Sequence, residues 1–383
     1  MIDKRLNIDI KKIIDFRQKL HKFPELSGKE KETVNLIKHF ISRFNPLKVY
    51  DLNSYSVAFE FGIGHSGKTI MFRADIDALA IYEDNELPYR SVNRGISHKC
   101  GHDGHTAILA GLAEILSKID VKDRIILLFQ SAEETLSGAL DVIGDKQFHL
   151  IKPDVIIGFH NIPGYEQNSI IVRKGEFNAY VSGIKVIFRG RSFHAAYAKE
   201  NMSFLNALIN AIKIVKNIFY QSDYSKVGDL NLTYLMYGSP SFGISPDELI
   251  IHLVPRAYSV EDLENIMDFV ERQMHAISNK YGLEIDLVYT EDAPAIYNDE
   301  FLTNLLVETV REEKRKLIEL NKPFSWGEDF GFYTIKYKGI YFAFGAGKDC
   351  AQLHSKDYDF PDQILLPSIE FLFKFYLKLS YNL

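Results

Sequence analysis

The stretch GHTAILAGLAEILSKIDVKDRIILLFQSAEE, from Gly104 to Glu134, decides the predicted fold. Its first half, up to Ile119, has apolar residues at strongly helical spacing. Its second half contains the apolar run IILLF, which is typical of a buried strand, and ends in the adjacent acids Glu133 and Glu134. A helix followed directly by a buried strand is the repeating unit of α/β proteins with a mostly parallel sheet.

The same alternation continues on both sides of this stretch and returns near the end of the chain. The predicted helices are 8–23, 31–44 and 301–317, and the predicted strands are 68–79, 153–161 and 339–347. Between them the order changes to strand, helix, strand, strand, helix, strand, which is typical of a small two-layer α+β unit. We therefore expect an α/β catalytic domain at 1–176 and 292–383, interrupted by an inserted ferredoxin-like domain at 177–291.

Composition excludes several classes of protein. The 383 residues are 46% hydrophobic and 25% charged, which is ordinary for a globular protein, and the length favours two domains. A net charge of −6 gives no reason to expect nucleic acid or an anionic membrane as a partner. No apolar run approaches the roughly 20 residues that span a bilayer, and no signal-peptide core is found. Two cysteines cannot staple a secreted protein of this length, so we expect a cytoplasmic enzyme.

Residues with metal-binding side chains follow the predicted strands. In open α/β sheets, ligands bind beyond the carboxyl ends of the strands. The residues at these positions are Asp75, Asp77, Glu133, Glu134, His160 and His354, and the loop SHKCGHDGHTA (Ser97–Ala107) adds Cys100 and His102. Imidazole, thiolate and carboxylate suit zinc, cobalt or manganese better than calcium or magnesium. The sequence therefore predicts a metal centre at this edge.

Each of these features also has a simpler interpretation. A cysteine and a histidine in a loop are common core residues, and adjacent glutamates are usually part of a solvated turn. A histidine after a strand is often a hydrogen-bonded core residue, and Asp-x-Asp often caps a helix or a loop. Their coincidence at one sheet edge favours a shared site. There, one glutamate can bind metal while its neighbour acts on a water whose pKa the metal lowers to roughly 7.

Eight motifs then make the chain recognisable. They are RQKLHKFPELS (17–27), RADIDAL (73–79), HKCGHDGH (98–105), FQSAEE (129–134), GFHNIPG (158–164), FHAA (193–196), GEDF (327–330) and LHSKDYDF (353–360). In this order, and spread over almost the whole chain, they resemble the aminoacylase/carboxypeptidase family of dinuclear metallohydrolases. The resemblance is strongest to the amidohydrolase branch of hippurate hydrolases, N-acetyldiaminopimelate deacetylases and auxin–amino-acid hydrolases.

The resemblance implies a role for each candidate residue. Cys100 would bridge two divalent metals, which in this family can be zinc, manganese, cobalt or nickel. The remaining metal ligands would be His102, Glu134, His160 and His354. Glu133 would be the general base and acid, Asp77 would orient a ligand, His194 would stabilise the oxyanion, and Arg256 would meet the substrate carboxylate.

We therefore expect a metal-dependent amidohydrolase that cleaves the amide bond of N-acyl amino acids carrying an acetyl, benzoyl or similar group. The fold would be that of a zinc exopeptidase, with the inserted domain serving as a lid and, in many relatives, pairing two copies into a homodimer. One alternative is a dipeptidase or carboxypeptidase acting on short peptides. Others are a non-catalytic metal- or ligand-binding module and a structural zinc knuckle, which would need paired cysteines close in sequence.

The chain departs from the family pattern near the substrate side. Ala80 and Ser131 stand where the family usually has proline, and no proline follows His194. The segment GISPDE replaces the usual asparagine-containing turn before Arg256. None of these changes removes a predicted ligand or Glu133, so the departures leave the acyl group and the amino acid open.

Overall fold

A computed structural model describes residues 8–64, 67–197, 202–218, 228–289 and 293–383, and these form two compact units. Unit 1 comprises Met1–Phe177, Ile296–Lys322 and Glu328–Leu383, and unit 2 comprises Asn178–Ala295 and Pro323–Gly327. The expected boundaries place residues 323–327 in the α/β domain, whereas they belong to unit 2. The expected boundary between 291 and 292 lies outside the described residues.

Unit 1 is built on an eight-stranded sheet in the order β1-β2-β4-β3-β5-β15-β6-β14. The strands are β1 (Lys48–Asp51), β2 (Val57–Phe61), β3 (Thr69–Asp75), β4 (Arg124–Gln130), β5 (Val155–Pro163), β6 (Ile170–Val172), β14 (Leu317–Glu319) and β15 (Lys338–Gly347). The central strands β4, β3, β5 and β15 pair in parallel, while β1, β2 and β4 pair antiparallel. A short ladder of β7 (Gly175–Glu176) and β13 (Tyr297–Asn298) completes this unit.

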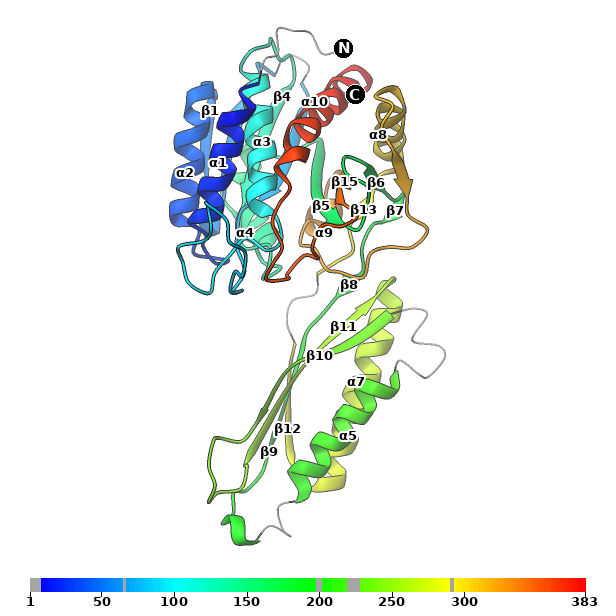
Figure 1. Cartoon of the computed structure of the whole chain (residues 1–383). Helices are drawn as coiled ribbons and strands as arrows, with labels where there is room; N and C mark the ends of the chain where they lie inside the picture. Colours follow the sequence, from blue (N-terminus) through cyan, green and yellow to red (C-terminus); the bar gives the residue numbers. More distant parts are fainter. Residues whose placement is uncertain (1–7, 65–66, 198–201, 219–227, 290–292) are drawn as a thin grey trace. The chain divides into compact units, whose positions relative to one another are not determined.

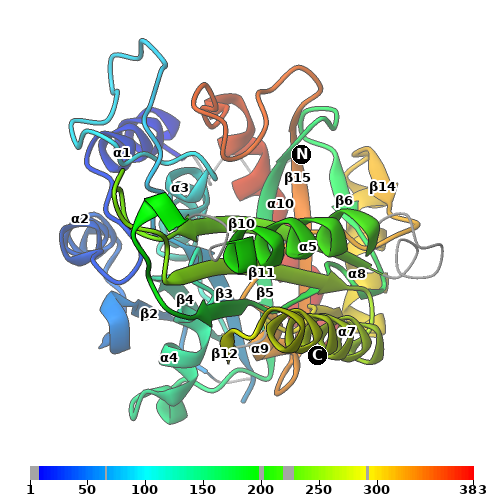
Figure 2. The same cartoon turned by 90° about the horizontal axis from the view of Figure 1, so that it is seen from below.

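Helices surround this sheet. They are α1 (Ile10–Lys22), α2 (Lys31–Ile41), α3 (His102–Leu116), α4 (Gly138–Gly144), α8 (Glu300–Glu312), α9 (Gly331–Thr334) and α10 (Leu365–Asn382). Short 3-10 turns lie at Ser42–Phe44, Asn53–Tyr55, Phe148–Leu150 and Asp362–Ile364. Figure 1 shows α1, α2 and α3 side by side, and Figure 2 shows α1 and α3 on one side of the sheet with α4 and α9 on the other.

Helix α3 is the centre of the core. All its residues are buried, which explains why its sequence is apolar nearly all round rather than amphipathic. Two glycines allow close packing: a Cβ at Gly104 would lie 2.2 Å from the ring of Phe360, and one at Gly111 would lie 2.3 Å from Ile369 of α10. The helix that begins in the Cys-His loop is therefore packed closely against the C-terminal segment of the chain.

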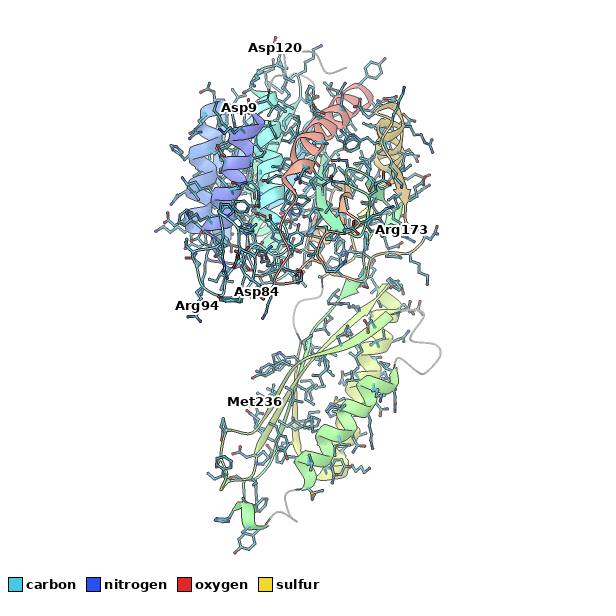
Figure 3. All side chains as sticks on the ribbon, in the orientation of Figure 1. Asp9, Asp84, Arg94, Asp120, Arg173 and Met236 are labelled. Atoms are coloured by element: carbon cyan, nitrogen blue, oxygen red, sulfur yellow. The ribbon has the colours of Figure 1, made fainter. Side chains whose placement is uncertain are left out.

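The parallel register brings the ends of the central strands to one edge. Asp75 pairs with Gln130 across β3 and β4, and Arg73 pairs with Gly158 across β3 and β5. The segments that follow these strands therefore start at the same edge of the sheet. In Figure 3, Asp84 marks the end of unit 1 to which the chain runs after β3, and Asp120 marks the opposite end.

Unit 2 is a four-stranded antiparallel sheet in the order β10-β11-β9-β12, with β8 added to β11. Its strands are β8 (Tyr180–Val181), β9 (Ile184–Arg189), β10 (Gly228–Tyr237), β11 (Glu248–Ala257) and β12 (Glu284–Tyr289). Helices α5 (Met202–Ile218) and α7 (Val260–Tyr281) lie side by side against one face of this sheet (Figure 1). The two units confirm the predicted fold class: an α/β domain with a mostly parallel core and a ferredoxin-like α+β domain. Among the described residues, no helix is both long and apolar enough to cross a membrane.

Candidate metal centre

The predicted ligands meet around the sulfur of Cys100. Its Sγ lies 3.4 Å from Nε2 of His160 and 3.3 Å from Nε2 of His354. Oε1 of Glu134 lies 3.7 Å from Nε2 of His102 and 3.6 Å from Nε2 of His354. The structure thus brings together all five residues that the resemblance assigns to the metals, although they come from segments up to 254 positions apart.

Unusual backbone conformations aim these side chains at one point. Gly101, between Cys100 and His102, has φ +96°, a left-handed conformation that suits glycine and lets the loop turn directly into α3. His354 also has a positive φ of 64°, and its backbone N–H donates to the carbonyl of Lys99 at 2.7 Å. This bond ties the loop after β15 to the residue beside Cys100.

The donor set fits two metal ions. Nε2 of His102 and Oε1 of Glu134 are buried, and neither has a hydrogen-bond partner among the described residues. Ligand atoms of Cys100, His102 and His160 lie within 4.8 Å of one another, and so do those of Cys100, Glu134 and His354. The two groups share the cysteine, as a bridging thiolate would require. Sulfur, imidazole and carboxylate together suit zinc and similar transition metals.

Asp77 connects two of these ligands. Its Oδ1 lies 3.1 Å from Nδ1 of His102, and its Oδ2 accepts the backbone N–H of Glu134 at 2.9 Å and the hydroxyl of Ser27 at 2.7 Å. Burial opposes ionisation, but the hydrogen bond with His102 lowers the pKa of Asp77. A carboxylate on Nδ1 keeps Nε2 of His102 available for a metal, which is the arrangement expected of a residue that orients a ligand.

The side chains of the centre have a high affinity for protons. Burial, followed by the charges of Glu134 and Glu133, raises the pKa of the Cys100 thiol well above its usual value. Burial also raises the pKa of Glu134 to about 7. Burial opposes protonation of His102, but the carboxylates of Asp75 and Asp77 raise its pKa to about 10. Because metal ligands must be deprotonated, cations bound here would replace these protons.

Glu133 lies beside the ligands without belonging to either group that contains Cys100. Its Oε2 is 3.8 Å from Nε2 of His102. Burial and then the charges of Glu328 and Glu134 raise the pKa of Glu133 well above the usual range for a carboxyl group. A glutamate with raised proton affinity, next to a metal centre, is suited to accept and return a proton.

A network around Arg73 was missed by the sequence analysis. This fully buried guanidinium contacts three carboxylates: Asp75 at 2.8 Å, Asp329 at 2.7 Å and Glu328 at 3.1 Å. The available signal was an arginine within the otherwise apolar strand IMFRAD, since a buried arginine requires acidic partners. The motif GEDF was recognised, but its acids received no role.

From the sequence, His105 was expected at the start of the helix after the Cys-His loop or among the residues around the ligands, and it lies in the first turn of α3. Its Nδ1 lies 2.6 Å from Oδ1 of Asp75, and its Nε2 lies 2.7 Å from Oδ1 of Asn161. The backbone carbonyl of Asn161 in turn lies 2.7 Å from Nδ1 of His160, which leaves Nε2 of His160 facing Cys100. His105 therefore supports the ligand His160 from behind, through its neighbour in β5.

One departure from the family pattern has a visible compensation. The backbone N–H of Ser131 donates to the hydroxyl of Ser56 at 3.1 Å, a bond that proline cannot form. Hydrogen bonding in this chain thus restrains the position where proline is usual.

The two remaining candidates, His194 and Arg256, belong to unit 2. His194 is exposed, and Arg256 lies on β11 opposite Asp229 of β10. Their roles stay predictions.

Comparison with known proteins gives consistent matches. Residues 71–378 match peptidase family M20/M25/M40. The chain is 33% identical over 353 residues to N-acetyl-L-cysteine deacetylase of Bacillus subtilis (strain 168), covering 88% of this chain and 81% of that protein. It is 29% identical over 359 residues to N-acetyldiaminopimelate deacetylase of Lactobacillus helveticus, covering 92% and 93%. A dinuclear metal binding peptidase of the M20 family from Bacillus subtilis superposes with a TM-score of 0.80 at 25% identity, covering 100% of both chains.

Proposed function

Since the chain belongs to peptidase family M20/M25/M40, we propose that it hydrolyses the amide bond of N-acyl amino acids with the help of two divalent metal ions. Membership of this family makes the protein a hydrolase that acts on amides. The observation that carries the proposal is the cluster in which four metal-binding side chains, those of His102, Glu134, His160 and His354, lie around the buried Cys100 with Glu133 beside them.

In the proposed reaction, the metals would be held by Cys100, His102, Glu134, His160 and His354. When bound, they supply a Lewis acid that polarises the amide carbonyl and lowers the pKa of water to near 7. Glu133 takes a proton from the attacking water and returns it to the amine that leaves. The nearby acids Glu328 and Asp329 favour the protonated form of Glu133 between these two steps. The products are a carboxylate and a free amino acid.

The other parts of the proposal concern unit 2 and the identity of the substrate. We propose that His194 stabilises the oxyanion of the tetrahedral intermediate and that Arg256 binds the carboxylate of the amino acid. We also propose that unit 2 serves as a lid and pairs two copies of the chain. The deacetylase names of two relatives support an N-acetyl substrate, and the sulfur, nitrogen and oxygen donors support zinc, manganese, cobalt or nickel.

The test is a substrate panel with the metal-free protein restored separately with each of these four metals. The panel compares acetyl-, benzoyl- and aminoacyl-amino acids, and we expect turnover of an N-acyl member. Glu133→Gln should keep two bound metals per chain by elemental analysis and lose a factor of about 10² to 10⁴ in kcat. Glu166→Gln, which removes an exposed charge paired with Lys316, is the matched control and should behave as wild type.

Two results would contradict the proposal. If no N-acyl amino acid is turned over with any of the four metals, the substrate class is wrong. If Glu133→Gln keeps the turnover of the wild type, the proton shuttle is wrong. Faster turnover of aminoacyl substrates would favour a dipeptidase.

A further inference from the structure

The turn that follows β4 carries Glu133 and Glu134, and two other residues of this turn have an unfavourable backbone conformation. Ala132, immediately before them, has φ 56°, and Leu136, shortly after them, has φ 57°. A left-handed conformation costs a residue with a side chain roughly 1–2 kcal/mol. Such conformations persist only where surrounding contacts hold them, and they are frequent at active sites. The turn therefore needs an anchor at Ala132.

Glu30 provides a contact at this point. Its residue is fully buried, and its Oε1 accepts the backbone N–H of Ala132 at 2.8 Å. Burial and then the charge of Asp77 raise the pKa of Glu30 to about 7. Burying a carboxyl group near another carboxylate costs free energy, and a neutral acceptor would satisfy the same N–H at a lower cost. Glu30 belongs to the loop PELSGKE (24–30), whose first residues form part of a recognised motif without an assigned role.

Glu30 and Asp77 hold the two sides of the general base. Glu30 accepts the N–H of Ala132, the residue before Glu133, and Asp77 accepts the N–H of Glu134, the residue after it. Ser27, in the same loop as Glu30, donates its hydroxyl to Asp77. The N–H groups of the residues before and after Glu133 are thus each held by a buried carboxylate, and one loop contributes to both contacts.

We propose that Glu30 is a positioning residue that keeps the Ala132 peptide in place and thereby aims Glu133 and Glu134 at the metal centre. This role rests on the proposed function. Without the acceptor, Ala132 can relax from its left-handed conformation, and the two glutamates that follow it move with the backbone. Loss of a residue that orients a metal ligand typically lowers metal affinity or activity 10- to 100-fold.

Two further variants separate this role from a general effect on folding. Glu30→Gln keeps a carbonyl oxygen that can accept the same N–H, so it should restore what Glu30→Ala loses. Glu25→Ala is the matched control in the same loop. The Glu25 carboxylate accepts the backbone N–H of Thr33 at 2.7 Å and its hydroxyl at 2.9 Å, so it secures the start of α2 rather than the turn. Its loss should lower thermal stability without moving the glutamates.

The experiment measures zinc affinity by competition with a chelating dye, and kcat and KM at saturating metal, for the wild type and the three variants. We expect Glu30→Ala to lose at least tenfold in both zinc affinity and kcat, with KM within threefold of the wild type. Glu30→Gln and Glu25→Ala should stay within threefold in all three quantities. Wild-type values in Glu30→Ala, equal losses in Glu25→Ala, or failure of Glu30→Gln to restore them would each overturn the proposal. If the wild type turns over no N-acyl amino acid, the proposed function fails, while zinc affinity still decides the role of Glu30.

Discussion

Replacing Gly101 by alanine tests whether the backbone between Cys100 and His102 sets the geometry of the metal centre. Gly101 has φ +96°, and an added Cβ would lie 2.2 Å from Oδ1 of Asn161 and 2.9 Å from the hydroxyl of Tyr358. Real Cβ atoms do not approach other atoms to 2.2 Å, so either the loop or the Asn161 side chain must move. Both movements disturb residues that contact the ligands.

The expected loss of stability has two parts. The positive φ costs alanine about 1–2 kcal/mol relative to glycine. Displacing Asn161 sacrifices its contacts with His105 at 2.7 Å and with Tyr358 at 2.6 Å, at about 1 kcal/mol each. The free energy of unfolding of unit 1 should therefore fall by about 3–4 kcal/mol. Gly95→Ala is the matched control, because Gly95 has φ +82° but open space around the new Cβ, and it should lose only about 1–2 kcal/mol.

Urea denaturation of the metal-free variants, followed by circular dichroism, measures both changes. The same proteins are then titrated with zinc. We expect Gly101→Ala to bind zinc at least tenfold more weakly than the wild type, and Gly95→Ala to bind it normally. If the two variants lose equal stability and both bind zinc normally, the contact with Asn161 is unimportant and the reasoning is refuted.

Two further predictions concern Cys100 and His21. Cys100→Ala should hold fewer than two metals per chain by elemental analysis, because both ligand groups lose their shared donor, and an unchanged stoichiometry would remove the cysteine from the ligand set. His21 is buried 2.9 Å from both Asp103 and Glu83, and although burial opposes its charge, these carboxylates raise its pKa to about 9 from an ordinary value of 6.5. The stabilisation by the charged His21 is then fully present below pH 6.5 and lost as the pH rises through 9. The difference in unfolding free energy between the wild type and His21→Asn should therefore shrink by about 3 kcal/mol between pH 6 and pH 10. A difference that stays constant over this range would contradict the charged pair.

The placement of the five ligands could be predicted because it depends on strand direction. Glu134 and His160 follow or end apolar strands that are readable from the sequence, and parallel pairing places such ends at one edge. The motifs supplied the assignments that spacing alone left open. Only the residues proposed to bind the metals and the proton were accessible in this way, since they lie within recognisable local patterns.

The supporting contacts could not be predicted because they join residues whose meeting depends on tertiary packing. Arg73 and Asp329 are 256 positions apart, and Glu30 and Ala132 are 102 positions apart. Neither pair has a shared periodicity or spacing that would indicate contact. Unit 2 consists of two separate segments for the same reason: residues 323–327 pack with residues 178–295, although the two segments are separated in sequence.

The distribution of buried charge explains why the centre should require cations. Arg73 contacts Asp75, Glu328 and Asp329 behind the site, at distances of 3.1 Å or less, and offsets part of their negative charge. Glu133 and Glu134 instead face His102 at 3.8 Å and 3.7 Å, beyond hydrogen-bond length. Their raised pKa values express the cost of holding two adjacent carboxylates in a buried place. Protons can reduce that cost, but bound divalent ions would reduce it while leaving Glu133 free to ionise. Because Arg73 contacts the acids behind the site, the charges of Glu133 and Glu134 are left for the proposed metal binding and proton transfer.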